Sequence, residues 1–208
     1  MSIALELQDI MPYLRMGGRA PDDALAARIG ELREKALAEV RPAAIWRRMA
    51  IPQGWLDESK ALSIRLAGCR EAYLACGTLG AAFDAYHRRI SVRSGADALI
   101  VQAIGAAAIE KVMDGIEGSI RAELAPGETL VARYSPGYAD FPLAEQRALL
   151  GLLDAPRTVG VSLTDSLLMV PSKSVSAVIG VSFGQAPMRP ADPSRPAEGG
   201  SGERRRTA

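Results

Sequence analysis

Residues 97–124 have the sequence DALIVQAIGAAAIEKVMDGIEGSIRAEL, which is rich in alanine and long enough for about eight turns of helix. When this stretch is helical, Ile100, Ile104 and Val112 are among the positions that face inward. The many small residues let neighbouring elements pack closely against it. A Pro-Gly pair at 126–127 then ends the helix. The stretch therefore predicts one long helix with close neighbours.

Other helices are predicted on both sides of this stretch from apolar spacing, capping residues and breakers. One helix has Asp9 as its N-cap and ends before the glycine pair at 17–18, and another follows Asp22, carries an apolar stripe and ends before Pro42. The first is expected to pack inward through Ile10, Tyr13 and Leu14. The predicted helices in all are 9–16, 22–41, 81–90, 97–124 and 142–153.

Segments rich in β-branched or aromatic residues, bounded by turn residues, predict the strands. Segment 71–76 fits a buried strand or a helical turn equally well. A turn is predicted at 52–54, and the last three β-rich segments suggest an antiparallel meander. Strands and helices occur without steady βαβ alternation, which predicts an α+β fold. The predicted strands are 44–51, 61–66, 129–134, 158–163, 167–170 and 174–183.

The composition predicts one folded domain followed by a tail. The chain has 208 residues and is 48% apolar, which is enough for a sizeable core, and we expect the domain to cover residues 1–184. Residues 185–208 are rich in Pro, Gly, Ser and Arg and cannot bury enough apolar area to offset the entropy of ordering, so we expect a disordered tail. The arginines at 204–206 are either solvated or in contact with an acidic partner.

The charge balance argues against two classes of partner. A formal charge of +1, from 25 basic and 24 acidic residues, gives no strong field for nucleic acid or for an anionic membrane. The longest apolar tract, 103–109, is far shorter than the roughly 20 residues that cross a bilayer. The first residues lack the basic and apolar pattern of a secretory signal. We therefore expect a cytoplasmic protein that binds neither nucleic acid nor membrane.

The patterns of common catalytic and cofactor sites are absent from the sequence. It has no G-x-G-x-x-G, P-loop or S-x-x-K motif, and its one G-x-S-x-G match, GVSFG at 180–184, ends a predicted strand with no predicted helix after it, so it does not indicate a nucleophile elbow. Cys69 and Cys76 lack C-x-x-C spacing, which favours buried thiols, and the single histidine, His87, cannot build a usual zinc site. The residues around His87 also do not match the D-x-H-x-x-G pattern of proteins that ligate cobalt. Any corrin must come from another chain.

Two stretches in the C-terminal half are unusual for a generic domain. They are RYSPGYADFP at 133–142 and GVSLTDSLLMVPSKSVS at 160–176. A Pro-Gly loop after a strand lets the backbone approach a ligand closely, Arg133 offers a planar fork for a carboxylate, and Tyr138 can stack on an aromatic ring. The alternative is an ordinary strand-turn-helix connection in which Arg133 pairs with a surface acid.

These two stretches contain the pattern Arg-x-x-Pro-Gly-Tyr and, further along, Leu-Thr-Asp-Ser-x-x-Met-x-Pro-x-x-Ser-Val-Ser. Together they resemble the activation domain of vitamin B12-dependent methionine synthase. The segments 73–80 and 103–110 also resemble shorter, stand-alone members of that family. The resemblance covers residues 5–183.

The resemblance implies an antiparallel sheet flanked by helices, with a shallow surface groove for S-adenosylmethionine. In this family, cob(I)alamin that has been oxidised to cob(II)alamin is reduced by an electron donor and takes a methyl group from the bound sulfonium. The domain binds and positions the methyl donor, so no general base is required. The implied partners are a corrinoid methyltransferase, which supplies the cobalamin, and a flavodoxin-like or iron-sulfur electron donor.

The first motif carries most of the implied ligand-binding residues. By resemblance, Arg133 pairs with the carboxylate of the ligand. Ser135, Pro136, Gly137 and Tyr138 belong to the same binding set, and the last three line the adenosyl and methionine groups.

Four further residues are candidates by the same resemblance. Glu110 belongs either to the surroundings of the cationic ligand or to an exposed helix surface. Thr164, Asp165 and Ser166 match the second motif, where they either touch the ligand or brace their loop by local hydrogen bonds. Asp165 stands where glutamate is common in the long enzymes.

Three functions fit these observations. The first is a reactivation subunit that acts in trans on a corrinoid methyltransferase, with S-adenosylmethionine as methyl donor. The second is a module without turnover that docks on a corrinoid protein or senses S-adenosylmethionine. The third is a scaffold that has lost the ligand and mediates assembly.

Overall fold

The computed structural model describes residues 3–17 and 19–184. The predicted tail at 185–208 lies outside the described residues, so the tail and the domain boundary before it stay predictions. Among the described residues, no helix combines the length and the apolar character needed to cross a bilayer.

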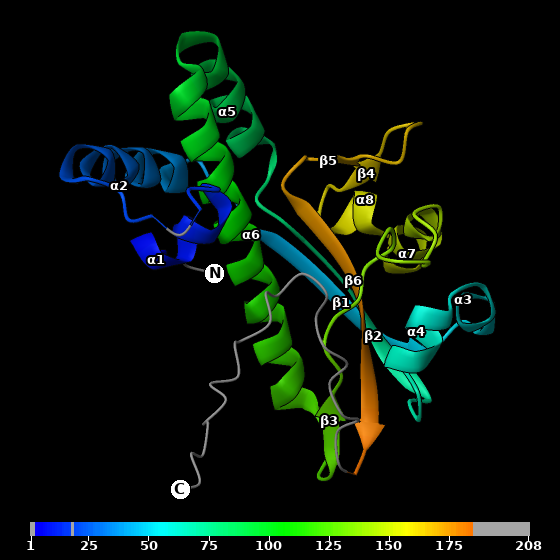
Figure 1. The fold of residues 1–208 in the computed structure, drawn as a ribbon. Coiled ribbons are helices and arrows are strands. Elements are labelled where there is room, and N and C mark those ends of the chain that lie inside the picture. Colours follow the sequence, from blue (N-terminus) through cyan, green and yellow to red (C-terminus); the bar gives the residue numbers. More distant parts are fainter. Residues whose placement is uncertain (1–2, 18, 185–208) are drawn as a thin grey trace, which may run out of the picture.

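A four-stranded antiparallel sheet lies at the centre of the fold (Figure 1). The bridge between Tyr134 and Val178 adds one more pair alongside the last strand. The predicted α+β class, with an antiparallel sheet flanked by helices, is confirmed. In spatial order the strands are β1 (Ala43–Ala50), β2 (Glu71–Thr78), β6 (Ser174–Phe183) and β3 (Glu128–Leu130).

One face of the sheet is covered by the long helix α6 (Gly95–Glu123) and the elements packed around it (Figure 1). The predicted long helix is confirmed, and it begins after Ser94, whose side chain caps it by accepting from the Asp97 amide. Helix and sheet are in such close contact that a Cβ atom on Gly77 of β2 would lie 3.0 Å from Val112. The other elements on this face are α1 (Leu7–Ile10), η1 (Met11–Tyr13), α2 (Asp23–Ala38) and α5 (Ala81–Arg93).

The opposite face is covered by shorter helices that share a second apolar core (Figure 1). Trp55, Leu62, Phe141 and Leu150 are buried there against Leu74 of β2. The helices are α3 (Gln53–Glu58), α4 (Lys60–Arg65), α7 (Glu145–Leu153) and α8 (Ala155–Thr158).

Segment 71–76, which the sequence left open between strand and helix, forms most of β2. Tyr73 and Ala75 belong to the core on the α6 side, whereas Leu74 and Cys76 belong to the core on the other side. Because both faces of this strand are covered, it lacks the apolar and polar alternation that identifies a half-exposed strand.

The last three β-rich segments do not form the predicted meander. β4 (Ser162–Leu163) and β5 (Met169–Val170) pair with each other as a separate two-stranded sheet, whereas β6 inserts between β2 and β3. Nearly every residue of β6 is buried. Such a strand requires partners at both edges and helices on both faces, which a surface meander does not supply.

The predicted strand at 61–66 is wrong, because this segment is largely the helix α4, and the predicted turn at 52–54 leads into α3. The Ser59 side chain caps α4 by accepting from the Leu62 amide. Leu62 and Leu66 are both buried. They are four residues apart, a spacing that places two side chains on the same face of a helix. The β-branched Ile64, which favoured a strand, is exposed.

Several predicted boundaries also move. The first helix begins at Leu7 rather than at Asp9, which is its third residue, and is capped by Glu6. The helix predicted from 142 begins at Glu145, and β3 covers only part of 129–134. Within 158–163, Thr158 ends α8 and only Ser162–Leu163 is strand.

Candidate functional site

The loop at 133–142 emerges from the sheet beside β6. Tyr134 exchanges backbone hydrogen bonds of 2.9 and 2.8 Å with Val178, which fixes the start of the loop. Gly137 has a φ of 91°, a left-handed conformation that favours glycine, and its amide donates to the Phe141 carbonyl over 2.8 Å. The Phe141 amide in turn donates to the Tyr138 carbonyl over 2.9 Å. The turn that the sequence predicted is therefore a closed, internally hydrogen-bonded loop.

Phe141 anchors this loop in the second core. It is 1% exposed, and its ring lies edge-on to Trp55 with the centroids 5.7 Å apart. The Tyr134 ring stacks on Phe141 at 6.3 Å, and the Arg65 guanidinium lies 5.1 Å above the Tyr134 ring. Both ends of the loop are thus held by packed aromatic rings.

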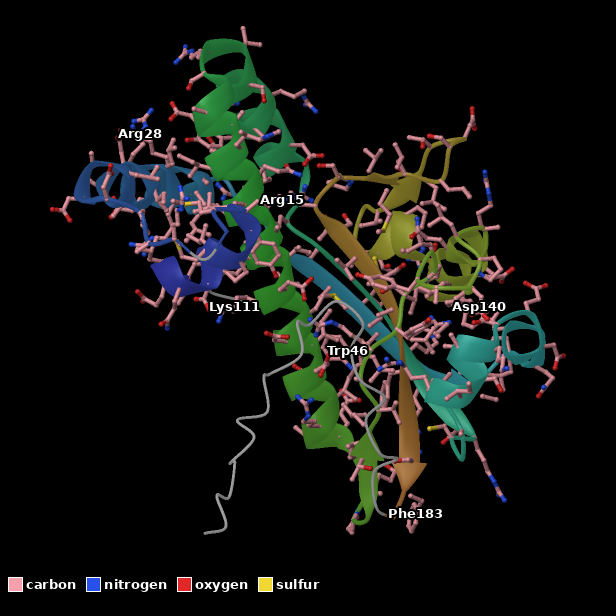
Figure 2. All side chains as sticks on the ribbon, in the orientation of Figure 1. Arg15, Arg28, Trp46, Lys111, Asp140 and Phe183 are labelled. Atoms are coloured by element: carbon pink, nitrogen blue, oxygen red, sulfur yellow. The ribbon has the colours of Figure 1, made fainter. Side chains whose placement is uncertain are left out.

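Asp140 ties the same loop to the N-terminus of α4 and lies between α7 and α4 (Figure 2). Its carboxylate accepts hydrogen bonds from the Ser59 hydroxyl at 2.6 Å and from the Lys60 and Ala61 amides at 3.0 and 3.1 Å. The hydrogen bond from Ser59, followed by those from the amides, lowers the pKa of Asp140 despite the opposing effect of desolvation. The carboxylate form is therefore the one that holds the loop.

We expect the Asp140→Asn variant to be less stable than the parent at pH 7 and less sensitive to acid. The pKa of Asp140 is lower in the folded chain than its ordinary value of 3.8. Its stabilisation is therefore present above that value and is lost as the pH falls through the lower, folded pKa. Urea unfolding at pH 7, 5 and 3 measures the effect. The prediction fails if parent and variant lose equal stability between pH 5 and pH 3.

Arg133 faces a row of carboxylates on α6. The residues Glu110, Asp114 and Glu117 are spaced by four and three, which places them on one side of the helix. The Arg133 Nη1 atom lies 2.6 Å from Glu117 and 3.0 Å from Asp114, and Nη2 donates to Glu110. Burial lowers the pKa of Arg133, but the hydrogen bonds and charges of the three carboxylates outweigh it and raise the pKa above its ordinary value. We call these four residues the Arg133 cluster.

The structure thus brings Glu110 and Arg133 together, although the sequence proposed them for separate reasons. The pairing of Arg133 with acids, which was one alternative from the sequence, is the state seen in this structure. Tyr138 is 65% exposed, and its ring lies 6.1 Å from that of Tyr134. Pro136 is buried, so the surface of the loop is formed mainly by its neighbours.

The second motif forms the turn of the β4–β5 hairpin. The Thr164 hydroxyl accepts from the Leu168 amide at 3.1 Å and lies 2.9 Å from the Ser166 hydroxyl. The backbone carbonyl of Asp165 lies 3.5 Å from Arg147 of α7. Among the described residues, no hydrogen bond or ion pair joins this turn to the Arg133 cluster. Its hydroxyl groups therefore brace the hairpin, and a ligand contact by Thr164, Asp165 or Ser166 stays a prediction.

Tyr13 of η1 is a residue beside the Arg133 cluster that the sequence analysis did not identify. It was predicted to pack inward, but its side chain is 41% exposed. Desolvation is the main cause that raises the pKa of Tyr13, and the charges of Glu110, Asp114 and Tyr138 add to it, while that of Arg133 opposes it. No local pattern signals this placement, because it arises only when the N-terminal segment packs on α6.

The cysteines and the histidine lie apart from this cluster. Cys76 is buried in β2, where desolvation raises the pKa of its thiol to about 12, and Cys69 is only partly buried. The Nε2 atom of His87 lies 3.2 Å from the Ala98 carbonyl oxygen. In the part of the chain that the structure describes, no group of three or more metal-ligating side chains is placed to hold a metal ion.

Comparisons with known proteins agree with this architecture. Residues 84–185 match the family model described as "Vitamin B12 dependent methionine synthase, activation domain". The matched segment contains α6 with its carboxylates, the loop at 133–142 and the β4–β5 hairpin. No curated protein sequence matches the chain significantly.

A solved structure titled "Crystal Structure of the MetH Reactivation Domain bound to AdoHcy" has a similar fold, with a TM-score of 0.58. The alignment covers 88% of this chain and 75% of that chain, at 15% sequence identity. At such low identity the likeness concerns the fold, and it extends beyond the segment that matches the family model. The resemblance predicted from the two sequence motifs is therefore confirmed: residues 84–185 match the vitamin B12-dependent methionine synthase activation domain family, and the fold of the chain resembles that of a solved reactivation domain.

Proposed function

We propose that this protein binds S-adenosylmethionine and supports the reductive methylation of cobalamin in a methionine synthase or a related corrinoid methyltransferase. The observation that carries the proposal is the Arg133 cluster beside a rigid loop, within the segment that matches the activation domain family. Members of this family act on cobalamin held by another module, so the proposed partner is a cobalamin-binding protein. The proposed location is the cytoplasm.

The charges of the Arg133 cluster suit a zwitterion that also carries a sulfonium. Arg133 offers the donors for the ligand carboxylate, and the exposed carboxylates of Glu110 and Asp114 suit the ammonium and sulfonium groups. Glu117 is 13% exposed and lies 2.6 Å from Arg133, so it holds the guanidinium in place. Among the described residues, the Nε–H group of Arg133 has no hydrogen-bond acceptor, so this edge of the guanidinium is left for a ligand carboxylate.

The loop at 133–142 would form the adjoining wall of the site. Gly137 allows the left-handed turn and the close approach of Leu143, and the exposed ring of Tyr138 offers a stacking surface for the adenine base. The loop is held by Phe141 and Asp140, so the cost of ordering it is already met before a ligand binds. The role of the chain is to bind and to orient, and it needs no acid or base for this.

The partner's cobalamin supplies the reactive metal, which after one-electron reduction takes the methyl group and leaves the sulfonium as a neutral thioether. Holding the methyl donor in line with the attacking atom makes a bimolecular reaction effectively unimolecular. This lowers the activation free energy of methyl transfer substantially. A flavodoxin-like or iron-sulfur protein is the proposed electron donor.

A reconstituted reaction tests the proposed function. The full chain is mixed with a corrinoid methyltransferase loaded with cob(II)alamin, a chemical reductant and S-adenosylmethionine, and methylcobalamin is followed by absorbance. We expect methylcobalamin to form faster with the parent chain than without it, and the Arg133→Gln variant to lose that gain. Equal rates with and without the chain, over several corrinoid partners, would exclude a role in reactivation.

One observation favours a second candidate function, a docking or sensing module without turnover. The guanidinium of Arg133 is already engaged by three carboxylates, so a ligand carboxylate must compete with them. Calorimetry with S-adenosylmethionine separates the candidates. Binding without acceleration of methyl transfer indicates a sensing module, and binding to the corrinoid protein alone indicates a docking module.

A further inference from the structure

The N-terminal strap, which we define as residues 5–15, lies against α6 (Figure 1). Asp9 forms an ion pair of 2.9 Å with Lys111, the residue that follows Glu110 on α6. Lys111 lies on the α1 side of α6 (Figure 2). The Arg33 guanidinium donates to the Leu5 carbonyl at 3.0 Å, and Ile10 is fully buried. Three independent contacts therefore hold the strap in place.

These anchors place Tyr13 against α6 near Asp114. Tyr13 follows Asp9 by four residues and ends η1, which contacts α6 directly, and Asp114 lies about one helical turn along α6 from Lys111, the partner of Asp9. Glu110, Asp114, Arg133 and Tyr138 all lie close enough for their charges to act on the Tyr13 hydroxyl. Tyr13 is 41% exposed, so part of it is open to solvent.

We propose that Tyr13 is a ligand-contacting residue of the Arg133 site and makes the site prefer a sulfonium to a neutral thioether. This inference rests on the proposed function. The strap lies outside the segment 84–185 that matches the family model, so the match does not assign this residue.

The physical basis is the electrostatics of an aromatic ring. The face of a tyrosine ring attracts a cation but gains much less from a neutral sulfur. The charges of Glu110 and Asp114 act on Tyr13, and so does that of Tyr138, whose ring is exposed. S-adenosylmethionine carries the positive sulfur, and S-adenosylhomocysteine, formed when the methyl group leaves, does not. A site built in this way holds the methyl donor and releases its product.

Calorimetry with both ligands tests the inference on the full chain. We expect Tyr13→Leu to weaken binding of S-adenosylmethionine by about 2- to 30-fold, the range of a cation-aromatic contact, with a smaller change for S-adenosylhomocysteine. Tyr13→Phe keeps the ring and should keep the preference for the sulfonium. The control is Phe183→Leu, which removes an exposed ring at the end of β6, away from Arg15 (Figure 2), and should change neither affinity.

The outcomes separate this inference from the proposed function. If the parent binds both ligands and Tyr13→Leu weakens them equally or not at all, Tyr13 does not select the sulfonium, and the proposed function stands. If the parent binds neither ligand, both proposals are overturned. Circular dichroism confirms folding, and Tyr13→Met, a flexible side chain without a ring, replaces Tyr13→Leu if that variant does not fold.

Discussion

The Arg133→Gln variant is expected to bind S-adenosylmethionine about 10- to 150-fold more weakly than the parent, because hydrogen bonds to a charged group contribute about 1.5–3 kcal/mol. Glutamine cannot replace the guanidinium fork, and it removes the positive charge between Glu110, Asp114 and Glu117. The three carboxylates then repel one another and no longer attract a ligand carboxylate. Isothermal titration calorimetry at constant ionic strength measures the change.

The matched control for this experiment is Arg28→Gln. Arg28 also bonds to two acids, Asp97 at 2.5 Å and Glu31 at 2.6 Å, but on α2, on the far side of α6 from the sheet (Figure 2). We expect it to leave ligand affinity unchanged. Arg133→Lys separates charge from geometry, because lysine keeps the charge and loses the fork. Unaltered affinity in Arg133→Gln would place the ligand elsewhere, even if the family assignment holds.

The Phe141→Ala variant is expected to lose about 3–5 kcal/mol of unfolding free energy, the usual cost of removing a buried aromatic side chain. For a chain of this size, the midpoint of thermal unfolding should fall by roughly 6–20 °C. Phe141 is fully packed between Trp55 and Tyr134, so its loss leaves a cavity and frees the loop at 133–142. The same variant should therefore bind ligand more weakly at temperatures where it is still folded.

Two further variants make the Phe141 prediction specific. Phe141→Leu fills much of the volume, so its loss of stability should be smaller than that of the alanine variant. Phe183→Ala removes a ring that is 79% exposed and should change stability by about 0.5 kcal/mol or less. Differential scanning calorimetry measures all three. If Phe141→Ala and Phe183→Ala have the same midpoint, Phe141 does not anchor the loop.

The sequence supported the class of fold because its strongest patterns are local. The long helix α6 was evident from its length and alanine content, and α2 was evident from its apolar stripe and the cap at Asp22. The strand β1 followed from its β-branched and aromatic residues. In each of these elements, residues close together in the sequence were enough to predict whether the segment is a helix or a strand.

The errors occurred where distant parts of the chain decide the local structure. α4 owes its N-terminus partly to Asp140, a residue far along the chain, whose carboxylate binds the Lys60 and Ala61 amides. β6 was placed in a meander because it follows β4 and β5 in sequence, although its partners are β2 and β3. The spacing of apolar residues in a short stretch of sequence reveals neither the contact of α4 with Asp140 nor the pairing of β6 with β2 and β3.

The candidate site, too, could be predicted from the sequence only in part. The motif at 133–142 was recognisable from sequence because a Pro-Gly turn beside an arginine and a tyrosine is a local pattern. The pairing of Arg133 with the α6 carboxylates, and the arrival of Tyr13 beside them, depend on how the helix, the loop and the N-terminal strap pack together.

The sequence by itself determined the α+β class, the long helix and the match of residues 84–185 to the activation domain family. Only the tertiary structure decided which strands pair and which charges meet at Arg133. Helix periodicity and caps depend on neighbours in the chain, whereas strand pairing and ion pairs depend on groups that become neighbours only after the chain has folded.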